Sequence, residues 1–273
     1  PVYYPFSEVI LDNNRRIVNS PLKLVNNRYE MDLDGFEAQV KTQKPRLYIM
    51  SNPHNPGGRV WTREELVRVA DICLENGVFI IADEIHSDIV FGESKHIAFT
   101  SLGEKYAQNC IICNSPSKSF NLAGLQHSYY IAPNPEIRRK ISAEIGKTGY
   151  GQCNIFGLVS LKAAYTNGES WLEEMNAYVW NNVLKMEKFL AEKLPKLRLM
   201  RPEGSYLVWV DFSGLNLSHD EVNRIMVGKA GLWLDEGTMF GKEGGGFQRF
   251  NVACPWSILE QALFKLEKAF SDI

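Results

Sequence analysis

The first half of the chain alternates short apolar runs with segments of helical periodicity. The apolar runs lie at residues 47–50, 78–82, 110–113 and 128–132. Continuous apolar runs of this length are typical of strands in a parallel sheet, because crossover helices cover both faces of such a sheet. The pattern therefore predicts parallel βαβ units in this half.

Helical segments separate these runs, and the first of them carries signals at both ends. Thr62 and Glu65 have the spacing of a capping box, and Gly77 stands where a helix commonly ends. Apolar residues between positions 66 and 73 recur at helical spacing. Further helices are predicted around residues 101–108, from Pro135 onward, over 155–194 with a break at 167–168, over 219–229 and over 258–270.

The pattern changes after Pro195. Residues 198–200 and 205–212 alternate like half-exposed strands, which predicts a smaller α+β domain. The predicted fold class is α/β, with a mostly parallel sheet and helices on both faces, plus this smaller domain. We place the large domain, including a long linking helix, at residues 1–190 and the small domain at 191–273.

Composition and charge narrow the range of partners. Hydrophobic residues make up 45% of the chain, charged residues make up 23%, and the net charge is −2. The charges are interspersed and no apolar run is long enough to span a bilayer, so we expect neither a nucleic-acid nor a membrane partner. The chain begins at Pro1 without a methionine, and we expect it to be processed or truncated.

The five cysteines include one C-x-x-C spacing, at Cys110 and Cys113. Both lie in a predicted strand, where residues three apart point to opposite faces. No second pair of cysteines or histidines completes a zinc site. We therefore predict core cysteines, no metal site and a reduced, cytoplasmic protein.

Three successive predicted strands each end in a polar segment. These segments carry Asn55, then Asp83 and His86, then Ser115, Ser117 and Lys118. Ligands of open parallel sheets bind beyond the carboxyl ends of the strands. If the strands are parallel, these side chains meet at one edge.

The residue types in this set suit an aldehyde cofactor. A lysine amine that loses its proton can form an imine, and a carboxylate can hold a pyridine nitrogen protonated so that the ring becomes an electron sink. Hydroxyls and backbone N–H groups near a helix start can bind phosphate. Taken singly, each residue is more commonly a cap, a surface charge or a turn residue. The combination, in this order, favours a site.

Residues 52–58, 83–88 and 115–121 resemble the class I/II aminotransferase family, which has the fold-type I pyridoxal 5′-phosphate architecture. The resemblance extends over nearly the whole chain. It implies that Lys118 is the catalytic Schiff-base lysine, that Asp83 pairs with the pyridinium nitrogen and that Asn55 donates to the phenolic oxygen.

The same resemblance implies roles for the remaining candidates. Tyr3 would stack on the cofactor ring, His86 would lie in the cofactor site, and Ser115 and Ser117 would bind the phosphate. Arg249 would clamp the substrate α-carboxylate, a bidentate task for which guanidinium is well shaped. Considered alone, Arg249 would more commonly be part of a structural ion pair.

Several details are similar to the cystathionine β-lyase, or C–S lyase, branch. His86 stands where typical aminotransferases have tyrosine, and Gln126 stands where they have arginine. Residues 235–241 and the Cys254-Pro255 turn also resemble that branch. The resemblance predicts α,β-elimination of L-cystathionine or related L-cysteine S-conjugates to a thiol, pyruvate and ammonia.

Two alternatives remain at this point. One is an aminotransferase, which would need an oxo acid to close its cycle, and the other is a non-catalytic aminotransferase-like sensor domain of a transcription regulator. Family members are homodimers that share active sites, so we expect a homodimer and a small amino-acid substrate. The family also has a stretch before the stacking aromatic, and we expect that stretch to be missing from this chain.

Overall fold

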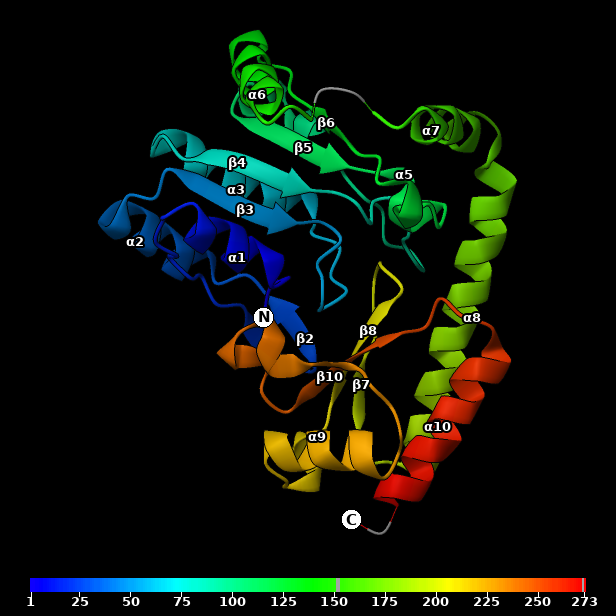
Figure 1. Cartoon of the computed structure of the whole chain (residues 1–273). Coiled ribbons are helices and arrows are strands. Elements are labelled where there is room, and N and C mark those ends of the chain that lie inside the picture. The colour runs from blue at the N-terminus through cyan, green and yellow to red at the C-terminus, as the bar shows by residue number, and fades with distance from the viewer. Residues whose placement is uncertain (151–152, 272) are drawn as a thin grey trace. The chain divides into compact units, whose positions relative to one another are not determined.

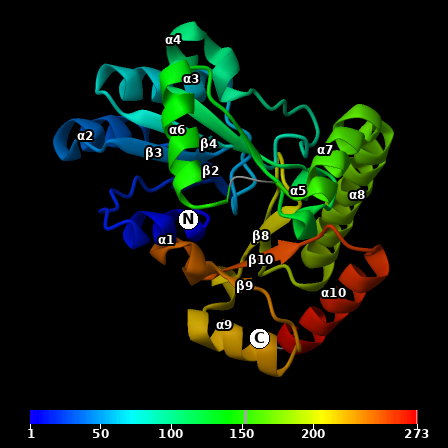
Figure 2. The ribbon, with the colours of Figure 1, turned by 45° about the horizontal axis from the view of Figure 1, so that its top comes forward.

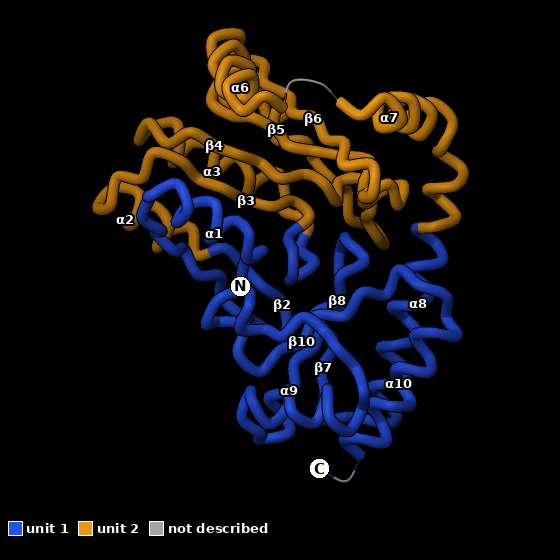
Figure 3. Tube along the Cα trace, in the orientation of Figure 1, with its two compact units in different colours: residues 1–31, 54–59, 176–273 blue, residues 32–53, 60–175 orange. Residues whose placement is uncertain are grey.

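The computed structural model describes residues 1–150, 153–271 and 273. The described chain divides into two compact units (Figure 3). Unit 1 comprises residues 1–31, 54–59 and 176–273, and unit 2 comprises residues 32–53 and 60–175. Segments of the two units alternate along the chain. The domain boundary near residue 190 stays a prediction.

Unit 2 contains a four-stranded sheet with the order β3-β4-β5-β6. Its strands are β3 (Leu47–Ser51), β4 (Phe79–Asp83), β5 (Cys110–Asn114) and β6 (Tyr129–Ile131). The strands β3, β4 and β5 are parallel, and β6 pairs antiparallel with β5 (Figure 1). The three predicted parallel strands therefore end at the same edge, where Ser51 lies opposite Asp83 and Asp83 lies opposite Cys113.

The helices of unit 2 include the four that were predicted there and two more, over residues 33–43 and 116–119, that were not among the predicted helices. They are α2 (Leu33–Gln43), α3 (Arg63–Glu75), α4 (Glu104–Ala107), α5 (Pro116–Ser119), α6 (Pro135–Lys147) and α7 (Ile155–Asn167), with 3₁₀ turns η1 (Phe99–Leu102) and η2 (Ala123–Leu125). The capping box of α3 is formed, since Thr62 Oγ1 accepts from Glu65 N–H at 3.2 Å and Glu65 Oε2 accepts from Thr62 N–H at 2.8 Å. Gly77 follows the helix with a left-handed φ of 67°.

Unit 1 contains a four-stranded antiparallel sheet and a two-stranded hairpin. The sheet has the order β7 (Arg198–Met200), β8 (Leu207–Asp211), β10 (Phe247–Asn251) and β9 (Asp235–Glu236), and the hairpin consists of β1 (Lys23–Val25) and β2 (Arg28–Glu30). The sequence pattern indicated β7 and β8 but not β9 or β10.

Helices complete unit 1. They are α1 (Pro5–Asp12), the C-terminal part of α8 (Glu169–Lys193), α9 (His219–Gly228) and α10 (Trp256–Phe270), with 3₁₀ turns η3 (Ser213–Leu215), η4 (Gly237–Phe240) and η5 (Lys242–Gly244). Figure 2 shows α10 alongside this part of α8, where Phe189 and Phe264 meet edge to face at 5.6 Å. The predicted break at residues 167–168 separates α7 from α8.

An aromatic cluster forms the part of the unit 1 core beneath β10. Trp209 is 1% exposed, stacks on Phe247 at a centroid distance of 5.2 Å and meets Phe240 edge to face at 5.3 Å. Its indole N–H, which would otherwise be buried without a partner, donates to the Tyr29 hydroxyl at 3.2 Å. The cluster therefore packs β8 against β10, the strand that carries Arg249.

The remaining expectations concern the cysteines, a metal site and membrane-spanning helices. All five cysteines are free thiols, and burial raises the pKa of Cys110 to about 12 and of Cys113 to about 11. No group of three or more His, Cys, Asp or Glu residues within the described part of the chain could hold a metal ion. Across those same residues, no helix is both long and apolar enough to cross a membrane.

Candidate active site

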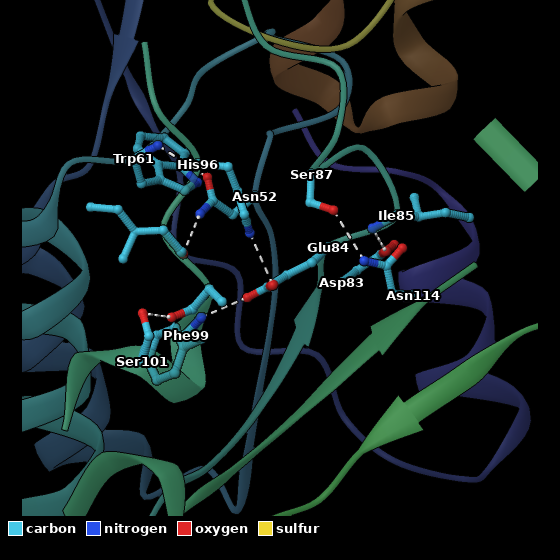
Figure 4. Close-up of polar contacts among 12 residues, drawn as sticks. Asn52, Trp61, Asp83, Glu84, Ile85, Ser87, His96, Phe99, Ser101 and Asn114 are labelled. Carbon is cyan, nitrogen blue, oxygen red and sulfur yellow. Dashed lines mark hydrogen bonds and ion pairs between the residues drawn. The ribbon is translucent and has the colours of Figure 1, made fainter. Parts of the chain in front are cut away.

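Asp83 ends strand β4 at the carboxyl edge of the unit 2 sheet. Its Oδ1 accepts a hydrogen bond from the Ile85 N–H at 3.1 Å (Figure 4). Burial raises the pKa of Asp83 to about 6, with a smaller contribution in the same direction from Glu84, while the Ile85 N–H and the charge of Lys118 act against the rise. The carboxylate is thus ionised at neutral pH in a site where a cationic partner would stabilise it.

Lys118 lies in α5, the single turn that follows β5. Its side chain is half-buried, and its charge is close enough to Asp83 to lower the pKa of that carboxyl. Lys118 and Asp83 are therefore near enough for their charges to interact, and the site that they would form stays a prediction.

Ser115 and Ser117 stand at the start of the same turn. Ser115 caps α5, since its Oγ accepts from the Ser117 N–H at 3.0 Å. The same oxygen lies 2.6 Å from the carbonyl of His127 and 2.7 Å from Ser117 Oγ. A hydroxyl has one hydrogen to donate and a phosphate can only accept, so a bound phosphate would compete with His127 for the Ser115 hydrogen.

His86 lies in the turn after β4. It is 3% exposed, and its carbonyl accepts from the Ile89 N–H at 3.0 Å, which fixes the turn that carries it. Its neighbour Glu84, which sequence reasoning did not select, is equally buried. Glu84 accepts from the Phe99 N–H at 2.7 Å and lies 3.0 Å from His96 Nε2 (Figure 4). Glu84 thereby anchors the loop after β4.

Two asparagines hold the other strand ends in place, and sequence reasoning did not identify their roles. Asn52 accepts from the Trp61 N–H at 3.1 Å, and Asn114 donates to Ser87 Oγ at 3.1 Å (Figure 4). Asn114 also accepts from the Ser115 N–H at 2.7 Å. These bonds fix the backbone beside Asp83 and Ser115. Their only sequence signal is that each asparagine directly follows a strand or ends one.

Arg249 lies on β10 of unit 1, and its side chain is 12% exposed. Its Nη1 donates to Asn55 Oδ1 at 2.9 Å, and its Nη2 forms an ion pair with Asp235. Its guanidinium carbon lies 4.7 Å from the centroid of the Phe240 ring. The structural ion pair is therefore present, and it fixes the plane of the guanidinium.

The contact with Arg249 determines how the Asn55 amide is oriented. A guanidinium can only donate, so the amide oxygen of Asn55 faces Arg249 and its NH₂ group is left to donate elsewhere. The loop that carries Asn55 is fastened within unit 1, because Gly58 O accepts from the N–H groups of Glu203 at 2.7 Å and Gly204 at 3.0 Å.

Tyr3 also belongs to unit 1. Its ring contacts Tyr4 at 5.4 Å and Phe6, edge to face, at 5.6 Å, and it packs against the aromatic cluster. Unit 2 thus contains the candidate amine, acid and hydroxyls together with His86. Unit 1 contains the amide, the guanidinium and the aromatic ring.

Comparison with known proteins places the chain in a family. The chain is 40% identical over 271 residues to "Cystathionine beta-lyase PatB" of Bacillus subtilis, covering 99% of this chain and 70% of that protein. It is 31% identical to "Protein MalY" of Escherichia coli, covering 100% and 70%.

The chain is also similar to solved structures of pyridoxal 5′-phosphate enzymes. Cystalysin from Treponema denticola, whose structure contains a pyridoxal 5′-phosphate cofactor, matches with a TM-score of 0.97 at 33% identity, covering 100% of this chain and 69% of that one. The PLP-bound C–S lyase from Staphylococcus hominis matches with a TM-score of 0.92 at 34% identity, covering 99% and 68%. Both likenesses confirm the predicted fold class. The model of the family "Aminotransferase class I and II" matches residues 1–266, and the chain therefore belongs to that family.

Proposed function

We propose that the chain is a pyridoxal 5′-phosphate-dependent C–S lyase. It would cleave L-cystathionine or a related L-cysteine S-conjugate by α,β-elimination to a thiol, pyruvate and ammonia. The observation that carries the proposal is the placement of the buried Asp83 and of Lys118 just at or after the carboxyl ends of neighbouring parallel strands, where the charge of Lys118 lowers the pKa of Asp83. The similarity to proteins named as cystathionine β-lyase and C–S lyase favours this chemistry.

The donor set fits the cofactor. A half-buried amine, a carboxylate with a pKa near 6, hydroxyls at a helix start and an oriented amide are the groups that an anionic aldehyde with a pyridine ring requires. When bound, the cofactor supplies an electron sink for the carbanion formed at the substrate Cα. The residues that would hold it are Tyr3, Asn55, Asp83, His86, Ser115, Ser117 and Lys118.

The chain's own residues would then carry out three tasks. Arg249 binds the substrate α-carboxylate through its planar guanidinium, which fixes the orientation of the Cα–H bond. The amine of Lys118 removes the proton from Cα as general base. Asp83, whose pKa burial raises to about 6, would when ionised keep the pyridine nitrogen of the cofactor protonated.

The test is turnover without an oxo acid. Protein carrying this chain is loaded with pyridoxal 5′-phosphate and incubated with L-cystathionine alone. We expect continuous release of pyruvate and homocysteine, and Lys118→Ala should abolish both this activity and the visible absorbance of the bound cofactor. The matched control is Lys265→Ala, which removes an exposed lysine of α10 and should change neither. A single stoichiometric turnover would instead identify an aminotransferase.

The homodimer and the cytoplasmic location belong to the same proposal. Helix α7 supports a dimer, because Ile155, Phe156 and Val159 are 69%, 73% and 63% exposed. An apolar surface of this kind is commonly covered by a partner in soluble proteins. Light scattering should give twice the chain mass, and Phe156→Glu should lower that mass toward the monomer.

A further inference from the structure

A polar network joins the first turns of α9 to the edge strand β9 of unit 1. His219 Nε2 lies 3.1 Å from Oε2 of Glu236, and Asn223 Nδ2 donates to the same oxygen. Thr238 Oγ1 lies 3.1 Å from His219 Nε2. Two side chains of one helix thus hold one carboxylate of β9.

The contacts determine how each member of the network is oriented. The Gly246 N–H donates to His219 Nδ1 at 3.4 Å, so Nδ1 is an acceptor and Nε2 carries the hydrogen that Glu236 accepts. The amide of Gln248, a residue that is 1% exposed, donates to Asn223 Oδ1, which leaves the Asn223 amide nitrogen facing Glu236. The network therefore includes a buried residue of β10, the neighbour of β9 in the sheet.

Strand β9 has only two residues, and their side chains point to opposite faces. Glu236 faces α9, whereas Asp235 forms the ion pair with Arg249. The register places Asp235 opposite Arg249 and Glu236 opposite Gln248. Asp235 is 41% exposed, and a two-residue strand has few backbone bonds to hold it, so whatever fixes Glu236 also helps to fix Asp235.

We propose that His219 and Glu236 are positioning residues for the substrate carboxylate. They fix β9, β9 places Asp235, and Asp235 holds Arg249 in the plane in which it receives the carboxylate. This inference rests on the proposed function, because it takes Arg249 as the arginine that binds substrate. His219 and Glu236 act through Arg249 and need no contact with the reacting atoms.

The kinetic test compares variants at the start of α9 with one on β9. His219→Ala and Glu236→Ala should raise KM for L-cystathionine fivefold or more while kcat stays within twofold. His219→Gln, which keeps a donor toward Glu236, should recover much of the lost affinity. The control Ser218→Ala removes the N-cap of the same helix, where Ser218 Oγ accepts from the Glu221 N–H at 3.3 Å, and should leave KM unchanged.

A coupling test and a cofactor-free measurement complete the design. Glu236→Ala introduced into an Arg249→Lys chain should add no further rise in KM, because the network acts through Arg249. Without cofactor, Glu236→Ala should speed backbone amide exchange in residues 232–240, and Ser218→Ala should not. If the unmutated protein has no lyase activity, the proposed function fails. If it is active and Glu236→Ala leaves both KM and exchange unchanged, this inference alone fails.

Discussion

At the scale of single residues, the guanidinium of Arg249 has two neighbours with different consequences. Asp235 neutralises its charge, while Asn55 receives one of its hydrogens and is thereby oriented. A lysine at this position would keep the charge but could not maintain both contacts in one plane. The plane of the side chain therefore matters as much as its charge.

We expect Arg249→Lys to raise KM for L-cystathionine at least tenfold, with a smaller change in kcat. A charge-assisted hydrogen bond contributes about 1.5–3 kcal/mol, and about 1.4 kcal/mol corresponds to a factor of ten. Steady-state kinetics of the loaded enzyme measure both constants. Arg201→Lys is the matched control, because Arg201 is 58% exposed in its ion pair with Glu187. Equal effects of the two substitutions would contradict a specific role for Arg249.

Candidate residues could be predicted from the sequence only where the signal lies in residues close to them along the chain. Asp83 and Lys118 each follow a recognisable apolar strand, so a position at the strand edge could be predicted for both. The ion pair of Asp235 with Arg249 joins residues that are 14 positions apart in the sequence. The contact of His219 with Glu236 joins residues that are 17 positions apart, one on a helix and one on a strand. No local pattern encodes such contacts, because they depend on strand register.

At the scale of elements, the turn after β9 depends on a close approach of two backbones. A Cβ at Gly237 would lie 1.8 Å from the carbonyl oxygen of Gly244 and 2.6 Å from that of Phe247. The obstructing atoms belong to the backbone, which cannot rotate away as a side chain could. This turn connects β9 to the loop that leads into β10, so a shift there would be transmitted to Asp235 and Arg249.

Gly237→Ala should therefore lower the free energy of unfolding by more than about 2 kcal/mol. Gly228→Ala is the matched control, since a Cβ at Gly228, the last residue of α9, meets nothing within 4 Å. Its effect should stay within about 1 kcal/mol. Urea unfolding of both variants measures the difference, and similar midpoints would show that the loop adapts at little cost.

The elements that the sequence predicted are those with strong local signals. The helix α3 has a capping box, helical periodicity and a terminal glycine, and β4 and β5 are apolar runs bounded by polar turns. Strand β9 consists of two polar residues that form a strand only because β10 lies beside them. The antiparallel direction of β6 likewise follows from its pairing and from no feature of its three residues.

At the scale of the whole molecule, the ionisation of the buried Asp83 lowers the free energy of unfolding. Burial raises its pKa from 3.8 to about 6, so between these values the folded chain holds a proton that the unfolded chain has released. The unfolded state binds fewer protons over this range, and the free energy of unfolding therefore falls as the pH rises. Above pH 6 the cost is fully present and is on the order of 3 kcal/mol.

We expect Asp83→Asn to abolish lyase activity and yet to stabilise the cofactor-free protein at pH 7. Asparagine keeps an acceptor for the Ile85 N–H but does not ionise, so the cost at Asp83 disappears. The gain should approach 3 kcal/mol at pH 7, shrink as the pH falls through 6, and vanish near pH 4. Urea unfolding of both proteins across this range measures it, with Asp12→Asn on the exposed end of α1 as a control that should show no such trend. A gain that did not depend on pH would mean that ionisation of Asp83 is not its source. The expected trend, together with the loss of lyase activity, would mean that Asp83 contributes to function at a cost in stability.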